Sequence, residues 1–348
     1  DITSVGVGGS GTENYLPIWL SGGNSLGDAS IYESSNNVGI GGTAPSTSPS
    51  LYVGADGNVG VGTTDPGAKL EVVGSTDTAQ FIIKGASGQT VANPLIQLQD
   101  SNSIALLEIN SDDVTNTFLG LNAGDSNTIT GGNNGKYNTF VGASAGGVNS
   151  TGYKNTATGY QALVLNQGGY GNTATGYRTM YSNTSGYTNT ASGRDAMFYN
   201  TEGYSNAAFG WEALFFNQTG KENAAFGREA GYGVSSNSYD RNSLFGYRAG
   251  YALTTGSNNI FMGYTAGDNA TAGANNIVIG YGIDLPTATS SNMLNIGNLI
   301  FATGINGTGT TLSTGNVGIG TTDPSYKLHV TGDGYFSTNL NIGVGLTT

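Results

Sequence analysis

Residues 155–226 carry one sequence four times and begin a fifth: NTATGYQALVLNQGGYG (155–171), NTATGYRTMYSNTSGYT (172–188), NTASGRDAMFYNTEGYS (189–205), NAAFGWEALFFNQTGKE (206–222) and NAAF (223–226). A period of about 17 residues predicts stacked units, each of which buries its apolar face against its neighbours. We therefore expect a solenoid, with the rest of the chain starting, extending and ending the stack.

The pattern Asn-x-x-x-Gly extends this repeat in both directions. Its ten copies are one period apart, except for two longer intervals, from Asn116 to Asn138 and from Asn223 to Asn242. A degenerate eleventh copy begins at Asn295. The longer intervals predict insertions in loops along one edge of the solenoid. The repeated residues are Asn116, Asn138, Asn155, Asn172, Asn189, Asn206, Asn223, Asn242, Asn259 and Asn276, with Gly120, Gly142, Gly159, Gly176, Gly193, Gly210, Gly227, Gly246, Gly263 and Gly280.

The apolar positions of the repeat predict a strand that is covered on both faces. With the asparagine as position 0, position 2 is always apolar, and position 3 is apolar except at Thr158, Thr175 and Ser192. Adjacent residues of a strand face opposite sides. A single coil covers only one of these sides, so the pattern indicates self-association around a shared axis. We expect an elongated homotrimer.

The other repeated positions predict how each coil turns. Glycine at position 4 indicates a positive φ or a close backbone approach. Position 7 is alanine, or Thr179, in nine of the ten repeats, which suggests a second strand. We therefore expect two strands of about five residues and two turns per coil. Ten coils at about 4.8 Å would give a rod of roughly 50 Å. Position 11 (Asn166, Asn183, Asn200, Asn217) and position 14 (Gly169, Gly186, Gly203, Gly220) predict a column of left-handed turn residues.

The flanking regions predict small β modules. Residues 58–74 (NVGVGTTDPGAKLEVVG) and 316–332 (NVGIGTTDPSYKLHVTG) agree at 12 of 17 positions, so one module occurs near both ends. Thr-Thr-Asp-Pro predicts a turn, and Lys-Leu-x-Val a short strand. Three alternating segments, TAQFIIKG, NPLIQLQD and SIALLEIN, predict a small sheet. The expected organisation is 1–74 (β modules), 75–112 (small sheet), 113–297 (repeat solenoid) and 298–348 (β module).

The composition excludes several classes of function. Only 11 of 348 residues are Lys or Arg, the net charge is −12 and no basic run occurs, which argues against nucleic-acid binding. The chain has no cysteine and no apolar run of about 18 residues, so disulfides, thiolate metal sites and membrane insertion are not expected. Aromatic residues make up 10% of the chain, which indicates a packed structure rather than a disordered one.

The candidate catalytic groups are few. His329 is the only histidine, and the related module has Glu71 there, so we expect a strand-surface role and no Ser-His-Asp triad. Paired carboxylates could hydrolyse glycans. The best constellation is Asp195, Glu212 and Glu229, one coil apart each, with neighbouring arginines that favour a salt-bridged edge. The other candidates are Glu202 and Glu222. We expect no catalytic, cofactor or metal site.

Two further columns have both a surface and an internal interpretation. Tyr170, Tyr187, Tyr204 and Trp211 are candidate surface contacts for glycan or protein, although packing between coils also explains such aromatic columns. A ladder of Thr-x-Thr at 156–158 and 173–175, continued by Thr-x-Ser at 190–192, has the pattern of ice-binding faces. Because it turns into Ala-x-Phe, an internal face is expected there.

Two sets of residues resemble known families. The Asn-x-x-x-Gly-x-x-Ala pattern resembles the head repeats of trimeric autotransporter adhesins, which form left-handed parallel β-rolls from usually shorter repeats. Segments 11–34, 36–42 and 316–345 are similar to shafts of phage tail fibres. That resemblance implies a trimer, and a chaperone domain that trimerises the chain and cleaves itself off near the position of Gly345–Thr348. No chaperone domain is present, so no residue is assigned to self-cleavage.

The sequence therefore predicts a structural, non-enzymatic fibre protein, exposed outside the cell or on a virion. Its expected partners are two further copies of itself and a cell-surface glycan or protein receptor, with no cofactor. One alternative is a self-polymerising extracellular filament joined through the related end modules. A second is a polysaccharide-degrading tailspike acting through Glu212 and Glu229.

Overall fold

The computed structural model of this protein describes residues 14–19, 26–34, 37–40, 51–53, 57–63, 65–73, 96–99, 105–110, 113–234 and 237–334. Every regular element in these ranges is a β-strand and none is a helix, which confirms the all-β prediction. The chain forms two units, Asp1–Lys84 and Gly85–Thr348. The strand predicted in residues 78–85 and the strand pair predicted near Asn341 lie outside the described residues.

The first unit holds a six-stranded sheet whose strands follow the order of the chain. Neighbouring strands are antiparallel from β1 to β5, and β6 is parallel to β5. The strands are β1 (Asn14–Trp19), β2 (Leu26–Ser34), β3 (Asn37–Ile40), β4 (Leu51–Val53), β5 (Val59–Val61) and β6 (Leu70–Val72).

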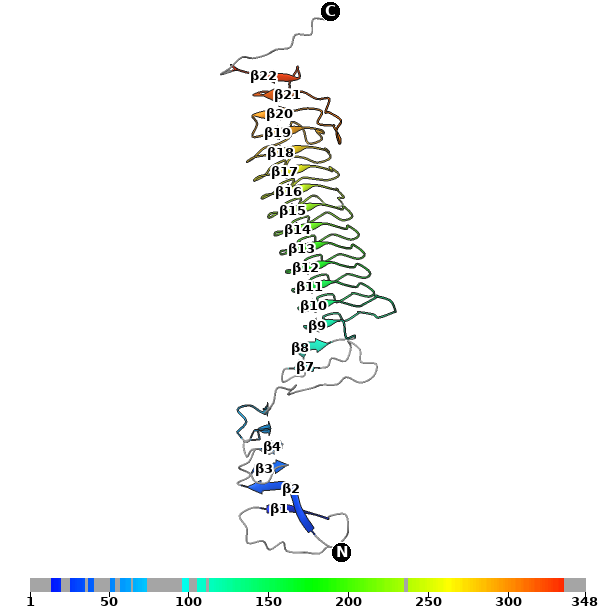
Figure 1. The fold of residues 1–348 in the computed structure, drawn as a ribbon, viewed down its shortest axis with the longest axis vertical. Helices are drawn as coiled ribbons and strands as arrows, with labels where there is room; N and C mark the ends of the chain where they lie inside the picture. Colours follow the sequence, from blue (N-terminus) through cyan, green and yellow to red (C-terminus); the bar gives the residue numbers. More distant parts are fainter. Residues whose placement is uncertain are drawn as a thin grey trace, which may run out of the picture. The chain divides into compact units, whose positions relative to one another are not determined.

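The second unit is one 16-stranded sheet built mostly from stacked coils (Figure 1). Strands β9 to β19 pair in parallel, which confirms the predicted solenoid with its period of about 17 residues per coil. Antiparallel strands precede β9 and follow β19. The strands are β7 (Ile96–Gln99), β8 (Ala105–Asn110), β9 (Thr117–Leu119), β10 (Thr139–Val141), β11 (Thr156–Thr158), β12 (Thr173–Thr175), β13 (Thr190–Ser192), β14 (Ala207–Phe209), β15 (Ala224–Phe226), β16 (Ser243–Phe245), β17 (Ile260–Met262), β18 (Ile277–Ile279), β19 (Leu294–Ile296), β20 (Ile300–Ala302), β21 (Val317–Ile319) and β22 (Leu328–Val330).

Each coil contains one three-residue strand, at positions 1 to 3, and the prediction of a second strand around position 7 is wrong. Positions 6 and 8 have positive φ, for example 51° at Arg178 and 52° at Met180, which an extended strand does not permit. The backbone there bonds alternately to the two neighbouring coils. The N–H of Arg178 donates to Tyr160 in the preceding coil, and that of Met180 to Ala196 in the next, both at 2.9 Å.

The glycine at position 4 is required by both conformation and space. Its φ lies between 129° and 143° in all ten repeats, a region that only glycine enters easily. A Cβ on Gly159 would also lie 2.4 Å from the carbonyl oxygen of Gly176 in the next coil. Both parts of the prediction for this column are confirmed.

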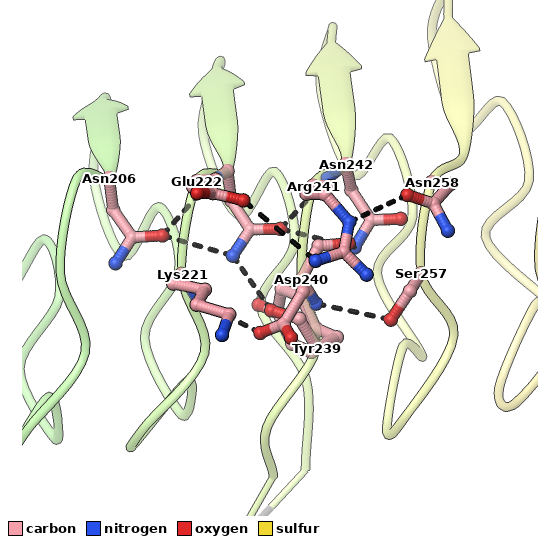
Figure 2. A network of polar contacts seen from close by, with 10 residues as sticks. Asn206, Lys221, Glu222, Tyr239, Asp240, Arg241, Asn242, Ser257 and Asn258 are labelled. Carbon is pink, nitrogen blue, oxygen red and sulfur yellow. Dashed lines mark hydrogen bonds and ion pairs between the residues drawn. The ribbon is translucent and has the colours of Figure 1, made fainter.

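The buried asparagines at position 0 connect every coil to the next. The backbone N–H of Asn172 donates to Oδ1 of Asn155 at 3.0 Å, and Nδ2 of Asn172 donates to the carbonyl oxygen of Gly186 at 2.8 Å. The same pattern continues through Asn206 and Asn242, as Figure 2 shows. A short carboxamide is the one side chain that supplies both the acceptor and the donors.

A second asparagine ladder, at position 11, confirms that these side chains stack in register. Asn183 donates to Oδ1 of Asn166 at 2.7 Å and to the carbonyl of Gly186 at 3.1 Å. The left-handed turn expected at positions 11 and 14 is wrong, because the positive φ falls on position 16, as at Thr188. Glycine is needed at position 14 for space, since a Cβ on Gly186 would lie 2.3 Å from Oδ1 of Asn183.

The core keeps its volume from coil to coil by exchanging size between positions 2 and 8. Where position 2 is Phe140, position 8 is Gly146, and a Cβ on that glycine would lie 2.4 Å from the phenylalanine ring. Where position 2 is Ala174, position 8 is the buried Met180. Since interiors pack at nearly constant density, the two columns vary in opposite directions.

The coil that begins at Asn223 departs from this exchange. Ala225 and Gly231 are both small there, and the longer loop of that coil supplies Tyr239, whose side chain is fully buried. The hydroxyl group of Tyr239 donates to the carbonyl oxygen of Gly231. The insertion thus replaces the core volume that positions 2 and 8 leave out.

We predict that the coil of Phe140 can take the arrangement of other coils, with a small side chain at position 2 and a large one at position 8. Phe140→Ala should cost about 3–5 kcal/mol of unfolding free energy because it leaves a cavity. Gly146→Leu should also destabilise the chain, since the new side chain overlaps the ring. In urea unfolding, the loss of unfolding free energy in the double variant should be smaller than the two single losses added together, by at least about 2 kcal/mol. Combining Phe140→Ala with Gly168→Leu, at an open loop position, should show no such coupling.

The asparagine ladder at position 11 is interrupted between Asn200 and Asn217, so a bonded and an unbonded asparagine can be compared. Nδ2 of Asn217 and Oδ1 of Asn200 have no partner, and Asn217 accepts only a 3.3 Å bond from the N–H of Tyr239. Asn183→Ala removes three bonds and should cost about 2–4 kcal/mol, whereas Asn217→Ala should cost at most about 1 kcal/mol. Equal losses in urea unfolding would show that the ladder does not carry stability in this way.

Candidate functional site

The outer sheet face, which consists of the side chains at positions 1 and 3, carries a row of exposed apolar residues in the described part of the solenoid. Position 2 points into the coil and is buried in every repeat. Position 3 points away from it, and the exposed fractions are 38% for Phe209 and Phe226, 36% for Phe245 and 45% for Met262. The phenylalanine rings stack on one another at 4.9 and 5.1 Å between centroids.

The outer sheet face continues beyond the last coil without a break. The pairing places Ile296 beside Ile300, Ile300 beside Ile319, and Ile319 beside Val330. From β14 to β22 the column that begins with Phe209 is therefore apolar on nine successive strands. At about 4.8 Å per strand, this strip is roughly 40 Å long.

In the described solenoid, both outward positions of the outer sheet face are polar on three strands only. On β11, β12 and β13 both outward positions carry hydroxyl groups; we call these six side chains the threonine band. All lie on the outside of the coil, and Thr156, Thr158, Thr173, Thr175 and Thr190 are exposed in the single chain. On the other side of the band, position 3 is apolar again at Leu119 and Val141, whereas position 1 is still threonine at Thr117 and Thr139. The members of the threonine band are Thr156, Thr158, Thr173, Thr175, Thr190 and Ser192.

The acidic column predicted at position 6 is an ion-paired edge. Asp195 is 2% exposed and accepts from Nε of Arg178 at 2.9 Å and of Arg194 at 3.1 Å. Glu229 is likewise held by Arg228 at 2.8 Å and Arg248 at 2.6 Å. The salt bridges expected at this edge are present, but these two carboxylates are buried while their arginines remain partly exposed.

The ion pairs make Glu229 a poor general acid. Burial alone would raise the pKa of its carboxyl group, but hydrogen bonds from Arg248 and Arg228 hold the pKa below its ordinary value. A glycosidase acid needs a raised pKa, so that it still carries its proton near neutral pH. The contacts of Glu229 are those of a structural ion pair between neighbouring coils.

The tyrosines predicted as surface contacts lie in one stack at position 15. The ring centroids of Tyr153, Tyr170, Tyr187 and Tyr204 are 4.9, 4.9 and 4.7 Å apart, with the rings nearly parallel. Nζ of Lys221 lies 5.4 Å from the last ring centroid. Stacking on a sugar needs an open ring face, and these faces are covered by the neighbouring rings. The packing interpretation therefore accounts for this column.

Trp211 belongs to a second column, at position 5, where aromatic rings alternate with guanidinium groups. Arg194 lies 5.5 Å and Arg228 4.2 Å from the Trp211 ring centroid. Tyr247, Tyr264 and Tyr281 continue the column, with centroids 4.9 and 5.1 Å apart. Both arginines also pair with the buried carboxylates, so the stack and the ion pairs form one edge that joins successive coils.

His329 has a structural role in the described part of the C-terminal module. Strands β21 and β22 pair in parallel with the same register as β5 and β6, so the two modules place Glu71 and His329 alike. Nδ1 of His329 accepts from the N–H of Ser325 at 3.3 Å, and Oε2 of Glu71 accepts from the N–H of Gly67 at 2.8 Å. Both side chains close the loop between the two strands.

One carboxyl pair was missed at the sequence level. Asp268 and Asp284 are hydrogen-bonded to each other, and burial together with this bond raises the pKa of Asp268 to about 6. Asp284 also lines an open pocket with Pro286, Asn298 and Phe301. The two residues occupy different positions of the repeat, so no column in the sequence pointed to their contact.

In the described ranges there is no group of three or more acidic or histidine side chains that could bind a metal ion. Those ranges also contain no helix with the length and hydropathy needed to cross a bilayer. The geometry thus brings together two sets of side chains. One is the outer sheet face with its threonine band, and the other is the edge at positions 5 and 6, where arginines pair with Asp195 and Glu229; we call this second set the paired edge.

The carboxyl pair should make stability depend on pH. The folded pKa of Asp268 lies above its ordinary value of 3.8, so the folded chain binds the proton more tightly than the unfolded chain. The contribution of Asp268 to the unfolding free energy is complete below about pH 4 and is lost as the pH rises through about 6. The unfolding free energy of Asp268→Asn should therefore rise relative to that of the parent by on the order of 1 kcal/mol between pH 4 and pH 7.5, after allowance for screening.

Urea unfolding at a series of pH values measures this difference. Adding Asp284→Asn to Asp268→Asn should produce no further pH dependence in this window, because the pair is already removed. A constant difference between the single variant and the parent from pH 4 to 7.5 would contradict the assignment.

Comparisons with known proteins identify no relative of this chain: no family model, no curated protein and no solved structure matches it.

Proposed function

We propose that this protein is the shaft of a trimeric surface fibre, in which three copies bring their outer sheet faces together on a common axis. The observation that carries this proposal is the apolar strip from β14 to β22, in which Phe209, Phe226, Phe245 and Met262 remain 36–45% exposed in the single chain. The function is structural: the fibre extends from a virion or a cell and carries a receptor-binding region at a distance.

The physical argument starts from the character of the sheet. Parallel sheets are normally covered on both faces, and here the coil covers only one. Soluble monomers rarely expose contiguous apolar patches of this extent, and larger patches mark interaction surfaces. The strip carries Phe209, Phe226 and Phe245 in a row, and aromatic residues of this kind dominate the energy of interfaces.

The periodicity favours a further copy of the chain as the partner. A partner of the strip must present apolar groups at the same spacing of about 4.8 Å along some 40 Å. The outer sheet face of a second copy has that spacing because it is built from the same stacked strands. Three narrow faces of two side-chain columns each can close around one axis, and closed cyclic symmetry leaves no face uncovered.

The expected location and partners follow from the same proposal. The fibre is extracellular or on a virion surface, and a glycan or protein receptor is bound by the assembled fibre. The stacked tyrosines and the paired edge lie on other positions of the coil and stabilise the shaft. No nucleic acid, membrane insertion, cofactor or enzymatic step belongs to this function.

A filament that polymerises end to end is the second candidate. One observation favours it: the same parallel strand pair occurs in both units, with Leu70, Val317 and Leu328 exposed. Such modules could join one molecule to the next.

A charge on the outer sheet face tests the fibre proposal. In native mass spectrometry and light scattering, the parent should have three times the mass of the chain. Phe226→Glu should raise the dissociation constant at least about 100-fold, since it buries unpaired charges on the axis. Circular dichroism should remain unchanged, because Phe226 points away from the core.

Val234→Glu, at an exposed loop position in the same coil, is the matched control and should leave the mass unchanged. A parent chain that stays monomeric at all concentrations would refute the proposal. Electron micrographs of the parent separate the two candidates, because rods joined end to end would favour the filament.

A further inference from the structure

The threonine band lies off-centre in the outer sheet face. It occupies β11, β12 and β13, with the four strands β7 to β10 on one side and the nine strands β14 to β22 on the other. On both sides the position 3 column is apolar, from Val141 downwards and from Phe209 upwards. The position 3 column therefore has a direction and a single polar segment, although its backbone repeats uniformly, while position 1 is threonine from Thr117 to Thr190.

Uniform repetition creates a problem for self-association. Two faces with the same spacing can meet in register, shifted by one coil, or antiparallel, and in each case the strands align equally well. An apolar contact does not distinguish these arrangements, because it is not directional. Something other than the apolar strip must select one arrangement.

We infer that the threonine band selects it: the copies associate parallel and at the same height, with the three bands together. This inference rests on the proposed self-association through the outer sheet face. In register, the hydroxyl groups of the band face one another and can exchange hydrogen bonds directly or through water. The band acts as a single polar layer does in a coiled coil, where it fixes register and partner number.

A shift of one coil is disfavoured by the residues that it would bring together. Ser192 would then meet Phe209, and Val141 would meet Thr158. Each such contact buries a hydroxyl group against an apolar side chain, without a hydrogen-bonding partner. The mismatch occurs at both edges of the band, whichever direction the shift takes.

An antiparallel pair is disfavoured by the position of the band. If two bands are superimposed antiparallel, centred on Thr175, then Val141 lies opposite Phe209. The long apolar side of each chain then extends past the short side of its partner, and the outer faces of β18 to β22 stay uncovered. The parallel arrangement covers the whole strip.

Disulfide trapping tests the inference, because the chain has no cysteine of its own. Three single variants are made, Val141→Cys, Phe209→Cys and Phe226→Cys, each in two chain lengths so that mixed links are recognised. Assembly in register predicts 209–209 and 226–226 links. A shift of one coil predicts 209–226 links, and the antiparallel arrangement predicts 141–209 links.

The decisive comparison removes the three hydroxyl groups that the band has at position 3. In the background Thr158→Val, Thr175→Val and Ser192→Val, the fraction of 209–226 links should rise at least fivefold while the chains remain associated. Thr188→Val, Thr219→Val and Thr255→Val, three exposed loop positions, should leave the link pattern unchanged.

The outcomes separate this inference from the fibre proposal. Mixed links at equal levels with and without the band, or an associated parent that forms no 209–209 link, would overturn the role of the band and leave self-association standing. A parent that is monomeric would overturn both.

Discussion

The structure depends on the buried asparagine ladder at position 0. Each carboxamide accepts the backbone N–H of the next asparagine and donates to a carbonyl of its own coil, so the chain must return to the same place in every repeat. The ladder holds even where loops are longer: the N–H of Asn138 reaches Asn116 across 22 residues, and that of Asn242 reaches Asn223 across 19. Insertions are therefore accommodated outside the ladder.

This anchoring separates the two faces of the strand. Inside the coil the space is fixed, so positions 2 and 8 exchange volume and a phenylalanine is always matched by a glycine. Outside the coil no such limit applies within the chain, and position 3 varies in long blocks: apolar, polar, then apolar. This variation follows from what the outer face meets, which is why we place the function there.

The edges show how a stack of identical units handles charged and aromatic side chains. Like residues in one column lie about 4.8 Å apart, which favours flat rings but would repel like charges. At positions 5 and 6 arginines are interleaved with the carboxylates, and the buried Asp195 and Glu229 each bind two guanidinium groups. The acidic column that resembled a catalytic constellation in the sequence therefore holds charges that are paired between stacked coils.

The sequence by itself determined the solenoid, its period, the starts of ten coils and the two asparagine columns, because a strict repeat places the same kind of residue at the same position of each coil. The eleventh coil begins at Met293 and not at Asn295 as predicted, since Ile277 pairs with Leu294 and the N–H of Met293 donates to Oδ1 of Asn276. It did not determine the path between positions 5 and 10, where two residues of positive φ replace a strand, since Met, Leu and Arg carry no sign of a left-handed conformation. Nor did it show which carboxylates are buried or that Asp268 meets Asp284, as these contacts depend on distances between coils. Only the tertiary structure decided which side of each strand the coil itself covers, because that depends on where the rest of the coil passes.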